Sequence, residues 1–191
     1  RRQVLQKLTG LHATMARLTP QIKYWLRTGF VAAKKAISLQ IPEAYTIVRG
    51  KVGKKVEFGF QWGVTRLRGG FLLATMGLHR GEVEDQRYVV GAVREVKALF
   101  GRAPKKYAYD RGGDGAQRIE ELGELGVEHI GVAPRGRRAW SVGGKVKDEL
   151  VREQAQVEGG IGNIKSGRYG FNRPAAHSAA MMGVCGQRAV L

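Results

Sequence analysis

Cysteine is nearly absent from this chain of 191 residues, in which Cys185 is the single example. One thiol cannot build an internal disulfide framework or a cysteine-rich zinc site, and this favours a reducing cytoplasm. The four histidines stand far apart without metal-ligand spacing, so we assign them no role. No apolar run reaches membrane-spanning length and no signal peptide is visible, so we expect no membrane partner.

Acidic residues are also scarce, with 16 Asp and Glu against 33 Lys and Arg and a net charge of +17. Such an excess favours a polyanionic partner, because neutralised phosphates release their counterions. A ribosomal-type or merely soluble basic protein is the alternative. The hydrophobic content of 43% is enough for a core, and the length favours one main domain. Because the first residue is Arg1 rather than Met, we expect a part of a longer chain.

The first 35 residues are predicted to be an N-terminal helical segment that precedes a main domain over residues 36–191. Apolar residues recur at helical spacing over residues 1–18, and Thr19-Pro20 is typical of an N-cap followed by a first-turn proline. The pattern therefore predicts a helical hairpin. The apolar positions of its first helix are Val4, Leu5, Leu8, Leu11, Met15 and Leu18.

The main domain reads as three strands followed by alternating helices and strands. Strands are predicted at 36–41, 56–66 and 71–76, with a basic glycine turn at 50–55 and a hairpin turn at 67–70. A helix follows from residue 84 to 100, which Gly101 and Pro104 close. The apolar face of this helix includes Val89, Val93, Val96, Leu99 and Phe100. A strand at 105–110, a helix capped by Asp114 and a strand at 127–132 come next. A basic loop at 134–147 and helices at 148–165 and 175–191 complete the order. This order predicts a ribonuclease H-like, five-stranded mixed sheet with flanking helices.

Asp110 stands at the end of a predicted strand and is followed by Arg111-Gly112-Gly113. A strand that delivers a carboxylate to its C-terminal end, beside glycines that leave room for a ligand, is typical of metal-dependent phosphoryl-transfer sites. The alternative is a simple turn, because Asp before Gly often forms one.

Glu158 lies on the long predicted helix at 148–165. Its neighbours Gly159, Gly160 and Gly162 each weaken a helix by up to roughly 1 kcal/mol relative to Ala, which indicates that something approaches the helix closely. Lys165 follows two turns later on the same face, where an ammonium could contact a phosphate. A solvated glutamate and an ordinary surface lysine are the alternatives.

Two basic stretches, 134–140 and 165–174, interleave arginines with aromatic residues, as proteins that bind nucleic-acid backbones and single strands do. Packed surface loops are the alternative. The candidate DNA-binding residues are Lys165, Arg111, Arg135, Arg137, Arg138, Arg168 and Arg173.

Several motifs together resemble the catalytic region of bacterial insertion-sequence transposases of the Asp-Asp-Glu class, over nearly all of residues 20–191. They include Val-Glu-Phe-Gly at 56–59, Tyr-Asp-Arg-Gly-Gly at 109–113 and the run from Glu158 to Asn172. The resemblance implies a ribonuclease H-like fold that holds Mg²⁺ or Mn²⁺ between three carboxylates. It also implies cleavage and strand transfer of element ends in double-stranded DNA, a homodimer on DNA as one arrangement, and a nucleoid-associated location in a bacterial cytoplasm.

By this resemblance Asp110 is the second acid, Glu158 is the third acid, and both are metal ligands. Lys165 is the lysine that contacts DNA. Ile41 stands where the first acid is expected, and Glu43 is the nearest substitute, with Asp85 as a further candidate. Val151 and Gln154 also depart from residues that relatives often carry.

Three functional hypotheses follow. The first is a transposase catalytic domain, active or degenerate. The second is a catalytically inactive DNA-binding protein that keeps the fold. The third is a ribonuclease H-like nuclease that only hydrolyses, since hydrolysis and strand transfer use the same carboxylates.

Overall fold

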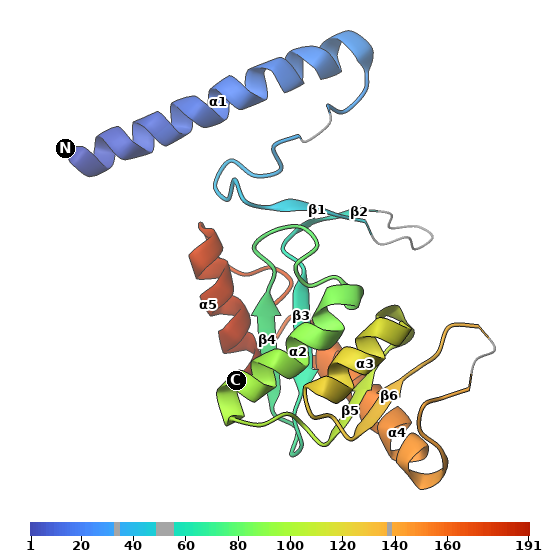
Figure 1. The fold of residues 1–191 in the computed structure, drawn as a ribbon. Helices are drawn as coiled ribbons and strands as arrows, with labels where there is room; N and C mark the ends of the chain where they lie inside the picture. Colours follow the sequence, from blue (N-terminus) through green and yellow to red (C-terminus); the bar gives the residue numbers. More distant parts are fainter. Residues whose placement is uncertain (33–34, 49–55, 137–138) are drawn as a thin grey trace. The chain divides into compact units, whose positions relative to one another are not determined.

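The structure is a computed structural model that describes residues 1–32, 35–48, 56–136 and 139–191. The chain forms two compact units, and each is described by itself. Unit 1 comprises residues 1–59 and 177–179, and unit 2 comprises residues 60–176 and 180–191. Both helices and strands are present, so the mixed α/β class is confirmed (Figure 1). The basic turn predicted at 50–55 lies outside the described residues.

Unit 1 opens with one continuous helix, α1 (Arg2–Thr28), so the predicted helical hairpin is wrong. Thr19 does not cap a second helix, because its Oγ1 donates to the carbonyl of Met15 at 2.9 Å inside the first one. Pro20 is accommodated within α1. The helix ends at Gly29, whose φ of 72° is the left-handed conformation that glycine favours at a C-terminus.

The strands of unit 1 are β1 (Tyr45–Val48) and β2 (Val56–Gly59), which pair antiparallel. The strand predicted at 36–41 is wrong, since these residues are irregular. There the amide of Ile41 donates to Oγ of Ser38 at 3.0 Å, a local bond that competes with strand pairing. The long strand predicted at 56–66 is also wrong, because Gly59 has a φ of 136° and the chain leaves β2 there.

The sheets of unit 2 are an antiparallel hairpin and a parallel pair. Strands β3 (Trp62–Arg66) and β4 (Leu72–Met76) form the predicted hairpin, whose turn places Gly69 and Gly70 at φ of 92° and 94°. Strands β5 (Lys106–Tyr109) and β6 (His129–Val132) are parallel. The described strands thus form three two-stranded sheets, and a joined five-stranded ribonuclease H-like sheet is not among them.

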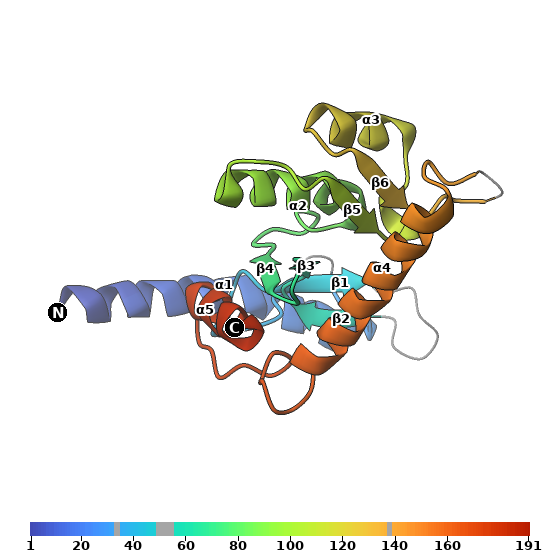
Figure 2. The ribbon, with the colours of Figure 1, turned by 90° about the horizontal axis from the view of Figure 1, so that it is seen from below.

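Helices lie on both faces of these strands. The helices of unit 2 are α2 (Asp85–Phe100), α3 (Ala116–Glu124), α4 (Gly144–Ile164) and α5 (Ala179–Val190). Gly63 and Thr65 face α2, since a Cβ on Gly63 would meet the Tyr88 ring and Thr65 Oγ1 lies 2.9 Å from Tyr88 Oη. Arg66, on the alternate face, pairs with Glu153 of α4 at 2.6 Å. Figure 2 shows α2 and α4 on opposite sides of the strands.

The core of unit 2 lies between α2, α3 and the parallel strands. Val89, Val93 and Leu122 are its fully buried side chains. The sequence predicted α2 with its buried Val96 and its closing Gly101, and both are confirmed. Leu99 and Phe100 were expected on the buried face and are instead exposed, because they belong to the last turn of α2.

Within the described part of the chain, every helix is too short or too polar to cross a bilayer.

Candidate functional site

Asp110 directly follows β5 and caps the short 3-10 helix η1 (Arg111–Gly113). Its Oδ1 accepts a hydrogen bond from the amide of Gly112 at 2.7 Å, while the residue as a whole stays exposed. One carboxylate oxygen therefore orders the turn. The strand-tip position and the turn, which the sequence left as alternatives, coexist in this structure.

The side chains of β5 alternate between two faces. Lys106 faces α4, where it pairs with Glu149 at 2.6 Å. Tyr109 faces α2, where its hydroxyl donates to Oδ1 of Asp85 at 3.3 Å. Because residues two apart share a face, Ala108 follows Lys106 on the α4 side of the strand. Asp110 lies after the strand, and its carboxylate turns to the amide of Gly112 in η1.

Asp85 is the first residue of α2 and lies against η1. A Cβ built on Gly112 would lie 2.3 Å from Oδ2 of Asp85, so only glycine allows this contact. Burial raises the pKa of the Asp85 carboxyl, and the negative charge of Asp110 raises it further. The hydrogen bond from Tyr109 and the charge of Arg135 act in the opposite direction. Asp85 and Asp110 therefore form a repelling carboxylate pair.

Arg135 is exposed, and its guanidinium is held across η1. Its Nη2 donates to the carbonyl of Gly112 at 3.0 Å and its Nε donates to the carbonyl of Arg111 at 3.2 Å. Its backbone amide donates to Oδ2 of the buried Asp114 at 2.7 Å. Asp114 was predicted to cap α3, which is wrong, because that helix begins after Gly115 without a side-chain cap.

Glu158 lies on an exposed part of α4, next to Val157, which is half-buried. A Cβ on Gly159 or Gly162 would meet no atom within 4 Å, and one on Gly160 would make ordinary contact with Leu72 at 3.6 Å. The described residues therefore do not explain the glycines of α4 by close packing.

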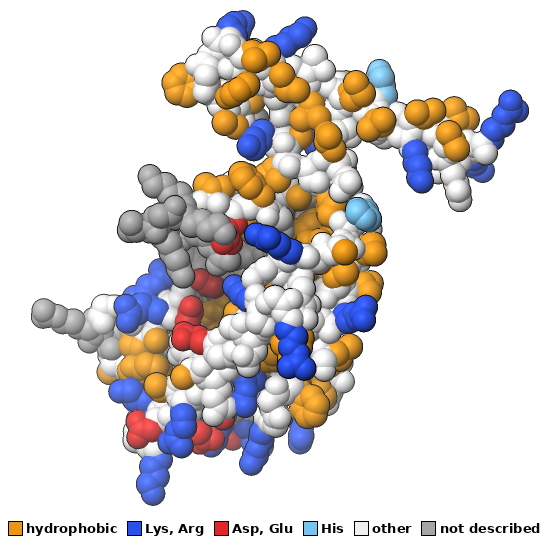
Figure 3. Space-filling model, turned by 180° about the vertical axis from the view of Figure 1, so that it is seen from behind, with side chains coloured by type: hydrophobic (Ala, Val, Ile, Leu, Met, Phe, Trp, Pro, Cys, Tyr) orange, Lys and Arg blue, Asp and Glu red, His pale blue; other side chains and the backbone are white. Residues whose placement is uncertain are grey.

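The other predicted residues are dispersed. Lys165 directly follows α4, and its carbonyl accepts from Nδ2 of Asn172 at 2.7 Å. Arg168 lies over the ring of Tyr169 at 5.8 Å, Arg173 and Arg111 are exposed, and Arg137 and Arg138 lie outside the described residues. Lys and Arg side chains are scattered over the visible face of unit 2 (Figure 3).

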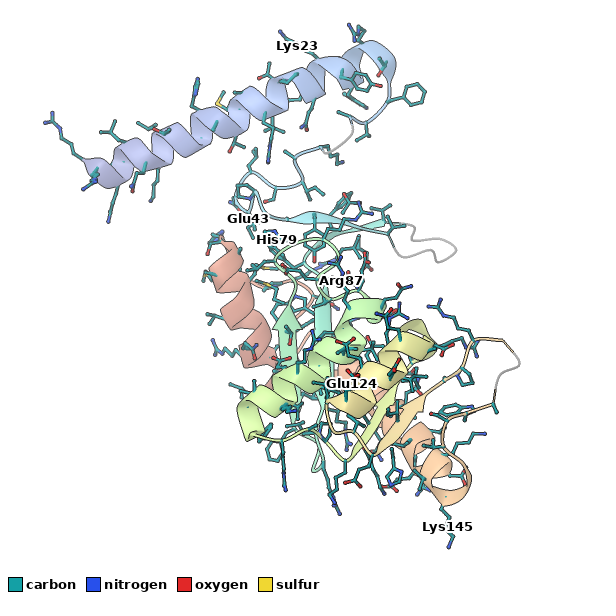
Figure 4. The ribbon with its side chains drawn as sticks, viewed as in Figure 1. Lys23, Glu43, His79, Arg87, Glu124 and Lys145 are labelled. Atoms are coloured by element: carbon teal, nitrogen blue, oxygen red, sulfur yellow. The ribbon has the colours of Figure 1, made fainter. Side chains whose placement is uncertain are left out.

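The candidates for the first acid belong to different units. Glu43 is exposed in the turn before β1 and belongs to unit 1, as does Ile41 (Figure 4). Asp110, Glu158 and Asp85 belong to unit 2. Among the described residues, no group of three or more His, Cys, Asp or Glu side chains is placed to hold a metal ion.

A divalent cation fits beside Asp85 and Asp110, whose negative charges repel each other where α2 lies against η1. Mg²⁺ is commonly held by one or two carboxylates together with waters and substrate phosphates. Asp85 and Asp110 supply two, and their mutual repulsion, which helps raise the pKa of Asp85, is what a cation beside them would relieve.

Sequence reasoning missed the roles of Tyr109 and Arg135 here. It placed Asp85 at the start of a helix and named it as a further candidate for the first acid. The acidic pair Glu84-Asp85 at the start of α2 was the sequence signal that could have given Asp85 more weight. Tyr107, on the same strand face as Tyr109, has a buried hydroxyl without a hydrogen-bond partner among the described residues.

Comparisons of the chain with protein-family models, with curated proteins and with solved structures found no match.

Proposed function

We propose that this chain carries a metal-dependent DNA phosphoryl-transfer site of the Asp-Asp-Glu transposase type, centred on Asp110. The observation that carries the proposal is that Asp85, the first residue of α2, lies against η1, the turn that the carboxylate of Asp110 caps. Asp85 is then the first acid in preference to Glu43, and Glu158 is the third. A bound Mg²⁺ or Mn²⁺ would activate water or a DNA 3′-hydroxyl and stabilise the leaving oxygen.

The protein's own residues hold the carboxylates ready for this chemistry. The amide of Gly112 fixes one oxygen of Asp110, and the hydroxyl of Tyr109 contacts Asp85. Arg135 braces η1 through two backbone carbonyls, which fixes the turn that carries Asp110. The net charge of +17 supplies the attraction for a DNA substrate.

A second candidate function, a DNA-binding protein without catalysis, is favoured by one observation. The described residues contain no three-acid group, and Glu158 makes no hydrogen bond or ion pair with them that would hold it toward Asp110. The two functions differ in cleavage and share DNA binding.

The test is nicking of supercoiled plasmid DNA by the full chain in Mg²⁺ and in Mn²⁺. We expect relaxed circles with the unmodified protein and none with Asp110→Asn, Asp85→Asn or Glu158→Gln. Glu124→Gln, on the exposed end of α3, is the matched control and should cleave normally (Figure 4). Binding without cleavage in either ion would favour the second candidate.

Two further variants separate the possible first acids. Glu43→Gln should leave cleavage intact if Asp85 is the first acid. Ile41→Asp should raise cleavage if position 41 is instead the vacant position of that acid. Normal cleavage by Asp85→Asn, together with loss of cleavage in Glu43→Gln, would show that Glu43 is the first acid.

A further inference from the structure

The apolar residues of α1 follow a seven-residue repeat. Successive spacings alternate between four and three residues along the helix, which is the a and d pattern of a coiled coil. The a positions hold Leu8, Met15 and Ile22, and the d positions hold Val4, Leu11, Leu18 and Trp25. We call these seven side chains the α1 seam.

The α1 seam is not covered within the described structure. No residue of α1 is buried. Trp25 is 54% exposed, Met15 is 59% exposed and Leu11 is 53% exposed. Leu18 is half-buried, and the side chain of Gln21, at a flanking position, accepts a hydrogen bond from the amide of Ala36 at 2.8 Å. Most of the stability of helices in proteins comes from packing of an apolar face, so we expect the exposed seam of this 27-residue helix to have a partner.

Charge is arranged around the α1 seam in a way that allows two copies to meet. The helix contains no acidic residue, so it cannot pair with itself through salt bridges. Arg2, Lys23, Arg17 and Arg27 occupy the outer b, c and f positions of the repeat. Among the flanking e and g positions Lys7 is the only Lys or Arg, so no row of like charges opposes association.

Pro20 also occupies an outer f position, opposite the α1 seam. The missing amide hydrogen and the bulk of its ring therefore lie on the side of α1 away from the seam. Within residues 4–25 every a and d position of the repeat holds an apolar or aromatic residue, as the interface of a coiled coil requires.

We propose that α1 is a homodimerisation helix, which pairs with α1 of a second copy of this chain as a two-stranded coiled coil. The helix is about 40 Å long at 1.5 Å per residue. Burying seven side chains on each copy, at roughly 60–120 Å² each, removes on the order of 800–1,700 Å² from water. That range overlaps the roughly 1,200–2,000 Å² of a stable interface.

The test is sedimentation equilibrium of the full chain without DNA at micromolar concentrations. The unmodified protein should have twice the monomer mass. Replacing two seam residues, Leu11→Glu with Met15→Glu, should restore the monomer because it places four carboxylates in the interface. The control, Ala13→Glu with Ala16→Glu, makes the same charge change at exposed outer positions and should stay dimeric.

A second measurement, on the unmodified chain, keeps the test decisive if the seam variant loses helical structure. Far-ultraviolet circular dichroism of the unmodified chain should show helicity that falls on dilution together with the dimer. A chain that stays monomeric up to about 100 µM overturns the proposal, as does dimerisation that survives in the seam variant. Dimerisation that requires DNA also overturns the proposal, because the two copies would then be held together by DNA and not by α1.

Discussion

The hydroxyl of Tyr109 donates a hydrogen bond to Oδ1 of Asp85 at 3.3 Å and so joins the end of β5 to the first turn of α2. Asp110 follows Tyr109 directly and adds its negative charge to the surroundings of Asp85. Tyr109 and Asp110, which are consecutive in the sequence, therefore shift the pKa of Asp85 in opposite directions. Tyr109 favours the ionised form of Asp85, and Asp110 opposes it.

Tyr109→Phe removes that hydrogen bond and keeps the ring that packs on Gly113. We expect a loss of about 0.5–1.5 kcal/mol in the free energy of unfolding, near the lower figure because the bond is long. The pKa of Asp85 should rise further. Urea unfolding and an NMR titration of the Asp85 carboxyl measure the two effects. An unchanged pKa would show that the bond does not form in solution.

Asp85→Asn tests the pH dependence of stability without metal. The folded-state pKa of Asp85 is raised, so the folded chain binds more protons than the unfolded chain just above the ordinary Asp value. The stability of the unmodified protein should therefore fall as pH rises from about 4 through the raised pKa. Asp85→Asn should lack this decline and be the more stable protein at neutral pH. Thermal unfolding of Glu124→Gln at several pH values should show the same decline of stability with rising pH as the unmodified protein. If both variants lose the decline, Asp85 is not its source.

Two glycine substitutions should change stability in opposite directions. A Cβ on Gly113 would lie 2.6 Å from Cδ1 of Tyr109 and 2.9 Å from Cγ2 of Val89, so Gly113→Ala should cost about 1–3 kcal/mol. Gly159→Ala, in the open face of α4, should stabilise by about 0.5–1 kcal/mol. Chemical denaturation measures both. A destabilised Gly159→Ala would show a contact that the described structure does not contain.

DNA binding should depend strongly on salt. Each phosphate contact contributes a slope of about −0.9 to the log–log plot of affinity against salt concentration. Arg168→Ala and Arg173→Ala, both exposed, should each reduce this slope, as titration by fluorescence anisotropy can measure. A flat salt response in the unmodified protein would remove nucleic acid as its partner.

Local signals in the sequence predicted the local structure well. Gly101 marked the end of α2, and Gly69-Gly70 marked the turn between β3 and β4. Predictions failed where a side chain offered the backbone an alternative, as Ser38 does to Ile41 and Thr19 does to Met15. The position of Asp85 beside the turn that Asp110 caps depends on how α2 packs against η1, and no local pattern carries that information.

The most direct test of the central claim, that Asp110 anchors a metal site, is to map the metal on the polypeptide. Fe²⁺ in place of Mg²⁺, with ascorbate and hydrogen peroxide, generates hydroxyl radicals that cut the backbone near the bound ion. We predict cuts around Asp110 and Asp85, competed by Mg²⁺ and absent in Asp110→Asn, with Glu124→Gln cut as the unmodified chain is. Cuts that are absent near Asp110, or that persist in Asp110→Asn, would contradict the account.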